Sequence, residues 1–174
     1  MKQTIKVRLN TESIAAAIRQ TKAYKKRLQK KADILRERIA YLIAKDASLV
    51  FNTATAGALI GEGAVTGHVD VRVEDQGTVT VIFFDGKDAI FMEFGAGVYG
   101  NGPVGTSPNP LGAALGYTIG SYGKGNGKKE VWGYYDEDHR LHITHGTPAS
   151  MPIYRAVTAV AHDIIDIARE VFDD

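Results

Sequence analysis

TKAYKKRLQKKADILRERIAYLIAKDASLVFNT, residues 21–53, decides the fold because it is the longest stretch with a single clear hydrophobic period. Its apolar residues recur at three- and four-residue steps, as they do on one face of an α-helix. They are Leu28, Ala32, Leu35, Ile39, Leu42 and Ile43. The pattern predicts a helix about 50 Å long, at 1.5 Å per residue. One small domain cannot bury such a helix fully, so we expect part of it to pack on a neighbouring molecule or to project into solvent.

The charge of the chain is strongly asymmetric around this helix. Residues 1–45 carry 13 Lys/Arg and 3 Asp/Glu, whereas the remaining 129 residues carry 8 and 17, which leaves a net charge of +1. Such a separation favours head-to-tail contact between copies, or contact of one face with a polyanion. A solvated basic helix is the simpler interpretation of the same charges.

The composition indicates one globular domain spanning residues 1–174. Hydrophobic residues make up 44% and charged residues 24% of the 174 residues, which is typical of a folded domain. The absence of cysteine excludes disulfides, thiolate zinc sites and cysteine nucleophiles, and suits a reducing cytoplasm. No apolar run approaches the roughly 20 residues of a membrane span, and the first residues do not read as a signal peptide. We expect a soluble protein with no membrane partner.

The rest of the chain predicts short strands and a second amphipathic helix. Thr4–Leu9 alternates as a strand does, and Asn10 or Thr11 can cap a short helix before residue 21. The other expected strands are the hairpin Val69–Glu74 and Thr78–Asp85, a third run Ala89–Phe94, and the pair Glu130–Tyr135 and Arg140–Thr144.

Ser150 can cap a final helix that ends near Phe172. Its expected buried face is Ile153, Val157, Val160, Ile164, Ile167, Ala168 and Val171. Residues 95–129 contain eleven glycines and three prolines, so we expect a long flexible loop there. The fold class is therefore α+β: an antiparallel sheet packed against a long basic N-terminal helix and a C-terminal helix, with a long Gly-rich loop.

Two glycine-rich motifs resemble nucleotide-binding loops, but the residues around each motif lack features that nucleotide binding requires. Gly95–Gly100 has G-x-G-x-x-G spacing, but no helix can begin in the glycine- and proline-containing stretch that follows, and no acidic residue occurs before Glu130. In the second, residues 120–129, Tyr122 stands where a P-loop needs glycine and Lys129 where it needs Ser or Thr. We expect no nucleotide cofactor.

A metal or catalytic site has little support in the sequence. His139, His142 and His145 lie near Asp136–Asp138, but alternation along a strand would place His142 on the opposite face from the other two. No G-x-S-x-G nucleophile motif occurs. We therefore expect no catalytic residue, no metal and no cofactor, and a protein that is not an enzyme.

Three separated segments together resemble a known family. Phe91–Gly97 is similar to the aromatic-x-Glu-Phe-Gly-Thr-Gly signature of a tail-component family of long-tailed bacteriophages, with Ala96 in place of the usual threonine. Residues 132–135 resemble that family's aromatic strand after its Gly-rich loop, and residues 144–152 its Thr-x-Gly-x-Pro-Ala-x-Pro segment. The order of the segments and the basic N-terminal helices also fit, so the resemblance covers most of residues 10–172.

The resemblance implies a structural virion protein that forms a ring at the head–tail junction, as a tail completion, terminator or neck component. It would be made in the host bacterial cytoplasm and would contact itself, neighbouring neck and tail proteins and, without sequence specificity, the double-stranded DNA in the channel. The motif and turn residues are Phe91, Glu93, Phe94, Gly95, Gly97, Trp132, Gly146, Pro148, Ala149 and Pro152. The residues expected to contact subunits or DNA are Lys22, Lys25, Lys26, Arg27, Lys30, Lys31, Lys124, Lys128 and Lys129.

Two other functions stay open at this point. A small nucleic-acid-binding module would use the basic helix, Lys22–Lys31, and its affinity would fall steeply as salt rises. An enzyme with a mobile lid at residues 95–129 has the least support, because no pairing of a base with a nucleophile is apparent.

Overall fold

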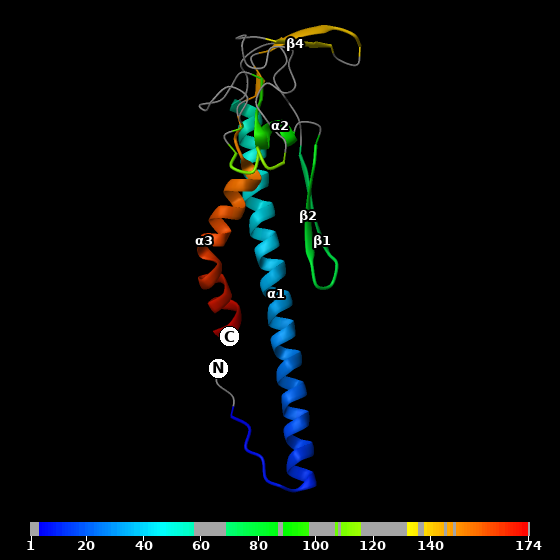
Figure 1. The fold of residues 1–174 in the computed structure, drawn as a ribbon, viewed down its shortest axis with the longest axis vertical. Helices are drawn as coiled ribbons and strands as arrows, with labels where there is room; N and C mark the ends of the chain where they lie inside the picture. Colours follow the sequence, from blue (N-terminus) through cyan, green and yellow to red (C-terminus); the bar gives the residue numbers. More distant parts are fainter. Residues whose placement is uncertain are drawn as a thin grey trace.

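A computed structural model gives the architecture of this chain. It describes residues 4–57, 69–86, 89–97, 107, 109–115, 132–135, 138–144, 146–147 and 149–173. Two helices dominate it, α1 (Thr11–Gly57) and α3 (Pro152–Asp173), which lie side by side (Figure 1). Between them in sequence come a short helix, α2 (Ala89–Phe94), and the strands β1 (Asp70–Asp75), β2 (Thr80–Asp85), β3 (Ala96–Gly97), β4 (Trp132–Tyr135), β5 (Leu141–Thr144) and β6 (Gly146–Thr147). The fold is α+β, as the sequence predicts.

Helix α1 is one continuous element of 47 residues, about 70 Å long at 1.5 Å per residue. Asn10 caps it, because its Oδ1 accepts a hydrogen bond from the Ser13 amide at 2.8 Å. The prediction of a separate short helix before residue 21 is wrong. Thr21 stays helical and its hydroxyl donates to the Ala17 carbonyl at 2.9 Å, a bond that a threonine can make within a helix.

Thr4–Leu9 is not a strand, which corrects the prediction from its alternating pattern. Residues 4–8 have no regular structure and residues 9–10 form a bend into α1. A strand requires a partner for its backbone groups, and none of the described strands pairs with this segment.

The β1–β2 hairpin is confirmed. Its strands pair antiparallel from Asp70–Asp85 to Asp75–Thr80. In the turn, Gly77 has φ +82°, a conformation that glycine adopts without strain, and the Gln76 amide donates to the Val79 carbonyl at 2.8 Å. Figure 1 shows the hairpin on the opposite side of α1 from α3.

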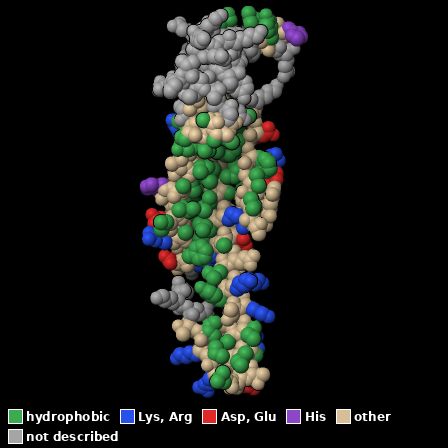
Figure 2. Space-filling model, in the orientation of Figure 1, with side chains coloured by type: hydrophobic (Ala, Val, Ile, Leu, Met, Phe, Trp, Pro, Cys, Tyr) green, Lys and Arg blue, Asp and Glu red, His purple; other side chains and the backbone are tan. Residues whose placement is uncertain are grey.

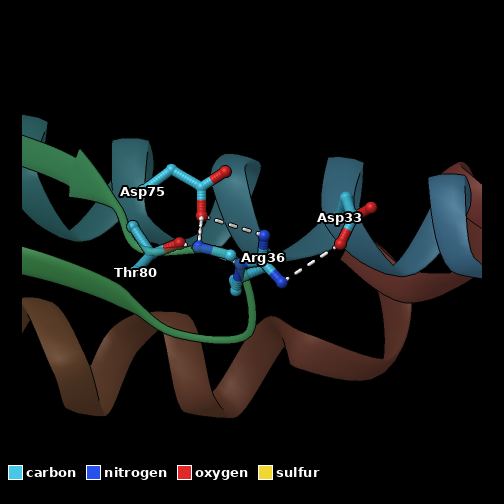
Figure 3. Close-up of polar contacts among 5 residues, drawn as sticks. Asp33, Arg36, Asp75 and Thr80 are labelled. Carbon is cyan, nitrogen blue, oxygen red and sulfur yellow. Dashed lines mark hydrogen bonds and ion pairs between the residues drawn. The ribbon is translucent and has the colours of Figure 1, made fainter.

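Arg36 fastens the end of this hairpin to α1 (Figure 3). Its Nε donates to Thr80 Oγ1 at 2.9 Å, and its Nη2 lies 3.1 Å from Asp75 Oδ1. Its Nη1 lies 3.1 Å from Asp33 Oδ1, one helical turn away. One guanidinium therefore bridges the helix and both strands.

Residues Ala89–Phe94 form helix α2, so the prediction of a third strand there is wrong. Ala89, Met92 and Glu93 are buried, a helical spacing of three and four residues. Gly95 ends the helix with φ +80°, and its amide donates to the Phe91 carbonyl at 2.8 Å. A six-residue run with five apolar or aromatic side chains fits a strand and a buried helix equally well.

The strand pair β4–β5 agrees with the predicted hairpin, with Trp132 opposite Thr144 and Tyr135 opposite Leu141. The short strands β3 and β6 pair antiparallel, joining the ends of two of the segments that resemble the phage family. The described strands thus form three separate two-stranded sheets.

The core lies where α1, α2, α3 and the base of the β1–β2 hairpin meet. Ala47, Phe51, Val69, Ala89, Met92 and Ala156 form the buried cluster. The Phe51 ring packs against Phe84 with centroids 5.6 Å apart. Since Ala156 packs near Phe51 while Val171 lies beside Lys31, α3 runs antiparallel to α1. This arrangement places the N-terminus of α3 next to α2.

Candidate functional site

The Glu93 carboxylate caps the N-terminus of α3. Its Oε2 accepts a hydrogen bond from the Ile153 amide at 2.8 Å and its Oε1 accepts one from the Tyr154 amide at 3.0 Å. These amides belong to the first turn of α3, which starts at Pro152 and has no partner for them inside the helix. A negative charge is favoured at this end of a helix dipole. The glutamate of the phage-like segment therefore has a definite structural task.

Ser150 does not cap α3, which corrects the prediction from its position. Its amide and hydroxyl donate instead to the Met92 carbonyl, at 2.9 and 3.2 Å. Met151, with φ 53°, occupies the cap position, because its carbonyl accepts the first helical bond from the Arg155 amide at 3.0 Å. The side-chain part of the cap comes from Glu93 in α2.

Asn109 holds the Glu93 carboxylate in place. Its Nδ2 donates to Glu93 Oε1 at 2.8 Å, and the two side chains are the buried polar pair of the described core, with Glu93 5% and Asn109 2% exposed. Asn109 Oδ1 also accepts from the Leu111 amide at 2.9 Å, which closes a turn. Ser107 Oγ donates to the Phe94 carbonyl from the same turn.

This turn belongs to the stretch predicted as a flexible loop, residues 95–129. Within that stretch the structure describes β3 and the turn around residues 109–115, where Gly112 has no room for a side chain because an added Cβ would lie 2.5 Å from Ser107 Cβ. Asn109 was missed by sequence reasoning. Its one sequence signal is the Asn109-Pro110 pair, which marks a turn but does not reveal a contact with Glu93.

The structure brings two of the three phage-like segments together. Residues 91–97 and 146–152 meet through the Met92 and Glu93 contacts and through the β3–β6 pairing, in which Gly97 lies opposite Gly146. Pro152 is buried at the start of α3, whereas Phe91, Phe94 and Ala149 are half-buried. Trp132 lies in the separate β4–β5 pair, and Pro148 lies outside the described residues.

The predicted contact lysines separate into three groups. Lys22, Lys25, Lys26, Arg27 and Lys30 are exposed on α1. Lys31 instead bonds within the chain, since its Nζ donates to the carbonyls of Val171 and Phe172 at 3.0 and 3.3 Å, at the C-terminal end of α3. Lys124, Lys128 and Lys129 lie outside the described residues.

Residues 11–30 of α1, called the proximal segment from here on, extend past both neighbouring elements. The C-terminal end of α3 lies beside Lys31, and the turn end of the β1–β2 hairpin lies beside Arg36. Figure 1 accordingly shows the first turns of α1 extending beyond α3 and the hairpin. The proximal segment carries six Lys/Arg and one glutamate, and no residue in it is buried.

The surface of α3 is divided as well. Pro152, Ala156, Val160, Ile167 and Val171 are buried. Val157 and Ile164 are exposed, so the predicted buried face is only partly correct. Figure 2 shows hydrophobic side chains gathered in a band over the two long helices, with charged side chains toward the edges.

The described residues offer little for a metal site or a membrane span. In the described part of the chain, no three His, Cys, Asp or Glu side chains are grouped to hold a metal ion. His139 is exposed, His142 lies in β5 and His145 is outside the described ranges. No helix among the described residues has the length and apolarity to cross a membrane. Comparisons with protein-family models, curated proteins and solved structures find no match.

Proposed function

We propose that this chain is a structural virion protein of a tailed phage, which forms a ring at the head–tail junction as a tail completion, terminator or neck component. The observation that carries the proposal is the proximal segment of α1, which extends past α3 and the β1–β2 hairpin and exposes both basic and apolar side chains. A ring subunit completes such surfaces with its neighbours, through heterologous contacts that close by rotation.

The Glu93 cluster supports a structural role over a catalytic one. Glu93 is the one buried charged residue of the described core, and both of its carboxylate oxygens already accept hydrogen bonds. A general acid or base needs a carboxylate that can reach substrate. The phage-like segments 91–97 and 146–152 thus contribute to holding α2 against α3, a task that a virion subunit and its relatives would share.

The test is to locate the protein in particles. Mass spectrometry of purified virions should detect it, and electron microscopy of virions lacking it should show heads and tails that fail to join. A protein absent from the virion, or a deletion that leaves complete particles, would overturn the proposal.

A second candidate function, non-specific nucleic-acid binding, is favoured by the exposed cations of the proximal segment. Six cations fall within the twelve positions 19–30: Arg19, Lys22, Lys25, Lys26, Arg27 and Lys30. Each phosphate that they neutralise should add about −0.9 to the slope of log affinity against log salt on duplex DNA. Measuring this slope with the isolated protein, and with Lys22→Glu and Lys26→Glu, separates the functions: tight binding by the monomer favours the module.

A further inference from the structure

The outer edge of strand β1 has no partner among the described strands. β1 and β2 form a sheet of two strands, and no other described strand joins it. Figure 1 shows no described element on the side of the hairpin away from α1. The edge of a sheet displays backbone N–H and C=O groups that can pair with a further strand. This edge therefore offers a surface for association through backbone hydrogen bonds.

The register of the hairpin identifies which backbone groups of β1 point outward. The Gln76 amide bonds to the Val79 carbonyl, so these two residues form a hydrogen-bonded pair. Such pairs alternate along an antiparallel ladder, so Arg72 and Glu74 direct their backbone groups toward β2. The N–H and C=O groups of the other residues between 71 and 75 consequently point away from β2: Val71, Val73 and Asp75.

The side chains of β1 alternate between the two faces of the sheet. Val71 packs against the core cluster, so Val71, Val73 and Asp75 lie on the face toward α1. Arg72 and Glu74 lie on the opposite face, where their side chains are 59% and 46% exposed. Val73 is 45% exposed although it lies on the α1 face. The middle of the strand thus has an exposed valine between two exposed side chains of opposite charge.

The sequence of β1, DVRVED, is complementary to itself around Val73. When two such strands pair antiparallel with Val73 opposite Val73, the outward backbone groups of Val71 meet those of Asp75, and each of these pairs can exchange both hydrogen bonds. Arg72 of each copy then lies directly opposite Glu74 of the other, at the positions where cross-strand side chains are closest. One register therefore satisfies both the backbone groups and the charges.

Neighbouring registers of the same edge are unfavourable. A shift of one residue would pair the outward groups with groups that already bond to β2. A larger shift would put Arg72 opposite Arg72, or Glu74 opposite Glu74, which brings like charges together. Charged side chains usually protect a strand edge from pairing, and here they oppose the shifted registers while favouring the one centred on Val73. The occupant whose charges match this edge is a second copy of the same strand.

We propose that two copies of this chain pair through the outer edges of their β1 strands, antiparallel and centred on Val73, to form a four-stranded sheet. A two-stranded sheet is only marginally stable by itself, and the pairing would cover the exposed Val73 side chains with each other. The contact has two-fold symmetry, so it joins the same surface of both copies and closes at a dimer. It goes beyond the proposed ring function and does not depend on it, because a ring uses unlike surfaces.

Cysteine cross-linking tests the register of this contact. The chain has no cysteine, so Val73→Cys introduces a single thiol at the centre of the paired strands. The Cα atoms of a hydrogen-bonded antiparallel pair lie about 5.5 Å apart, within the range that a disulfide spans. Oxidised Val73→Cys should therefore run as a covalent dimer on a non-reducing gel. Val79→Cys, at a 55% exposed position between the two strands, is the control, and an equal yield of dimer from both variants would overturn the inference.

Exchanging the charges tests the pairing of the side chains. In the Val73→Cys background, Arg72→Glu and Glu74→Arg each place like charges opposite one another in two identical copies. Either substitution should lower the yield of linked dimer at least about 10-fold. An equimolar mixture of the two variants should recover the yield, because two arginines of one chain then face two glutamates of the other.

Matched charge changes away from the hairpin are the control for this experiment. Arg155→Glu and Asp173→Arg alter the net charge by the same amounts at exposed positions of α3, on the opposite side of α1 from the hairpin. They should leave the yield of linked dimer unchanged, alone or mixed. An Arg72→Glu or Glu74→Arg chain that links as well as its parent, or a mixture that does not recover, would overturn the inference. Recovery in the mixture also shows that both variants fold.

Discussion

Helix α1 has two ends with the same period and different side chains. In residues 40–53, the distal segment, the buried positions are mostly small: Ala40, Ala44 and Ala47, with Phe51 at the centre of the core. Small residues let α3 approach closely. In the proximal segment the larger apolar residues Ile14, Ile18 and Leu28 share one side of the helix and stay exposed. Large side chains gain the most from burial, so these exposed residues are the part of α1 that the proposed contact with another molecule would stabilise most.

The largest expected effect comes from truncating one apolar side chain in each of these two segments of α1 and comparing the loss of stability. Phe51 is 1% exposed, and Phe51→Ala should lower the free energy of unfolding by about 3–5 kcal/mol, the usual cost of removing a buried aromatic ring. Ile18→Ala should cost less than about 1 kcal/mol in the monomer, as an exposed substitution does. Urea denaturation at low protein concentration measures both. Equal losses would mean that the proximal segment is packed within its own chain.

Each long helix has a glutamate beside its N-terminus: Glu93 of α2 caps α3, and Glu12 lies in the first turn of α1. Replacing each of them compares a buried helix end with an exposed one. Glu93→Gln replaces one acceptor oxygen of the α3 cap by an amide donor, which leaves a partly buried backbone amide without its acceptor and should cost about 2–3 kcal/mol. Glu12→Gln, at the exposed start of α1, should cost at most about 1 kcal/mol through the helix dipole. Chemical denaturation compares them. Similar losses for the two would show that burial of Glu93 does not matter.

Replacing Arg36, which joins the hairpin to α1, should lower the free energy of unfolding by a smaller amount. Arg36→Ala removes the contacts with Asp75 and Thr80, and since these groups are partly exposed we expect a loss of about 1 kcal/mol. Hydrogen exchange should accelerate most at the hairpin amides near the turn. Lys26→Ala, in the proximal segment, is the matched control and should leave both stability and exchange unchanged. If hydrogen exchange accelerated equally at amides throughout the chain, Arg36 would not act locally on the hairpin.

The sequence predicted the elements that local pattern determines. The period of α1, the turn around Gly77 and the amphipathic α3 are all written in neighbouring residues, and the structure confirms them. The errors fall where the pattern is short. The run Ala89–Phe94, with five apolar or aromatic residues out of six, fits two secondary structures. An alternating run at residues 4–9 needs a partner strand, which periodicity alone cannot predict.

The candidate site was less predictable, because its contacts join distant parts of the chain. Glu93 was singled out through its phage-like segment, but its role depends on amides about 60 residues later and on Asn109. Ser150 is a residue type that commonly caps helices, but Glu93 caps α3 instead, because a tertiary contact overrides the local preference. The basic helix was visible in the charge pattern, while the exposed flank of α3 emerged only once α1 was seen to cover one side of it.

The smallest expected effect lies on the side of α3 that solvent covers. His162 Nδ1 lies 2.8 Å from Asp163 Oδ1, and this hydrogen bond and the negative charge raise the pKa of His162 above its ordinary value of 6.5. A raised folded-state pKa adds stability below the unfolded pKa, and the contribution is lost as the pH rises through the folded value. Both groups are exposed, so the stability change should be slight, and NMR titration of the ring is the suitable measurement. Asp163→Asn should bring the pKa of His162 back toward 6.5, and Asp166→Asn should lower it less, because Asp166 acts only through its charge. An unchanged pKa in Asp163→Asn would show that the pair does not persist on this exposed side, in contrast with the buried contacts of Glu93 at the other end of the helix.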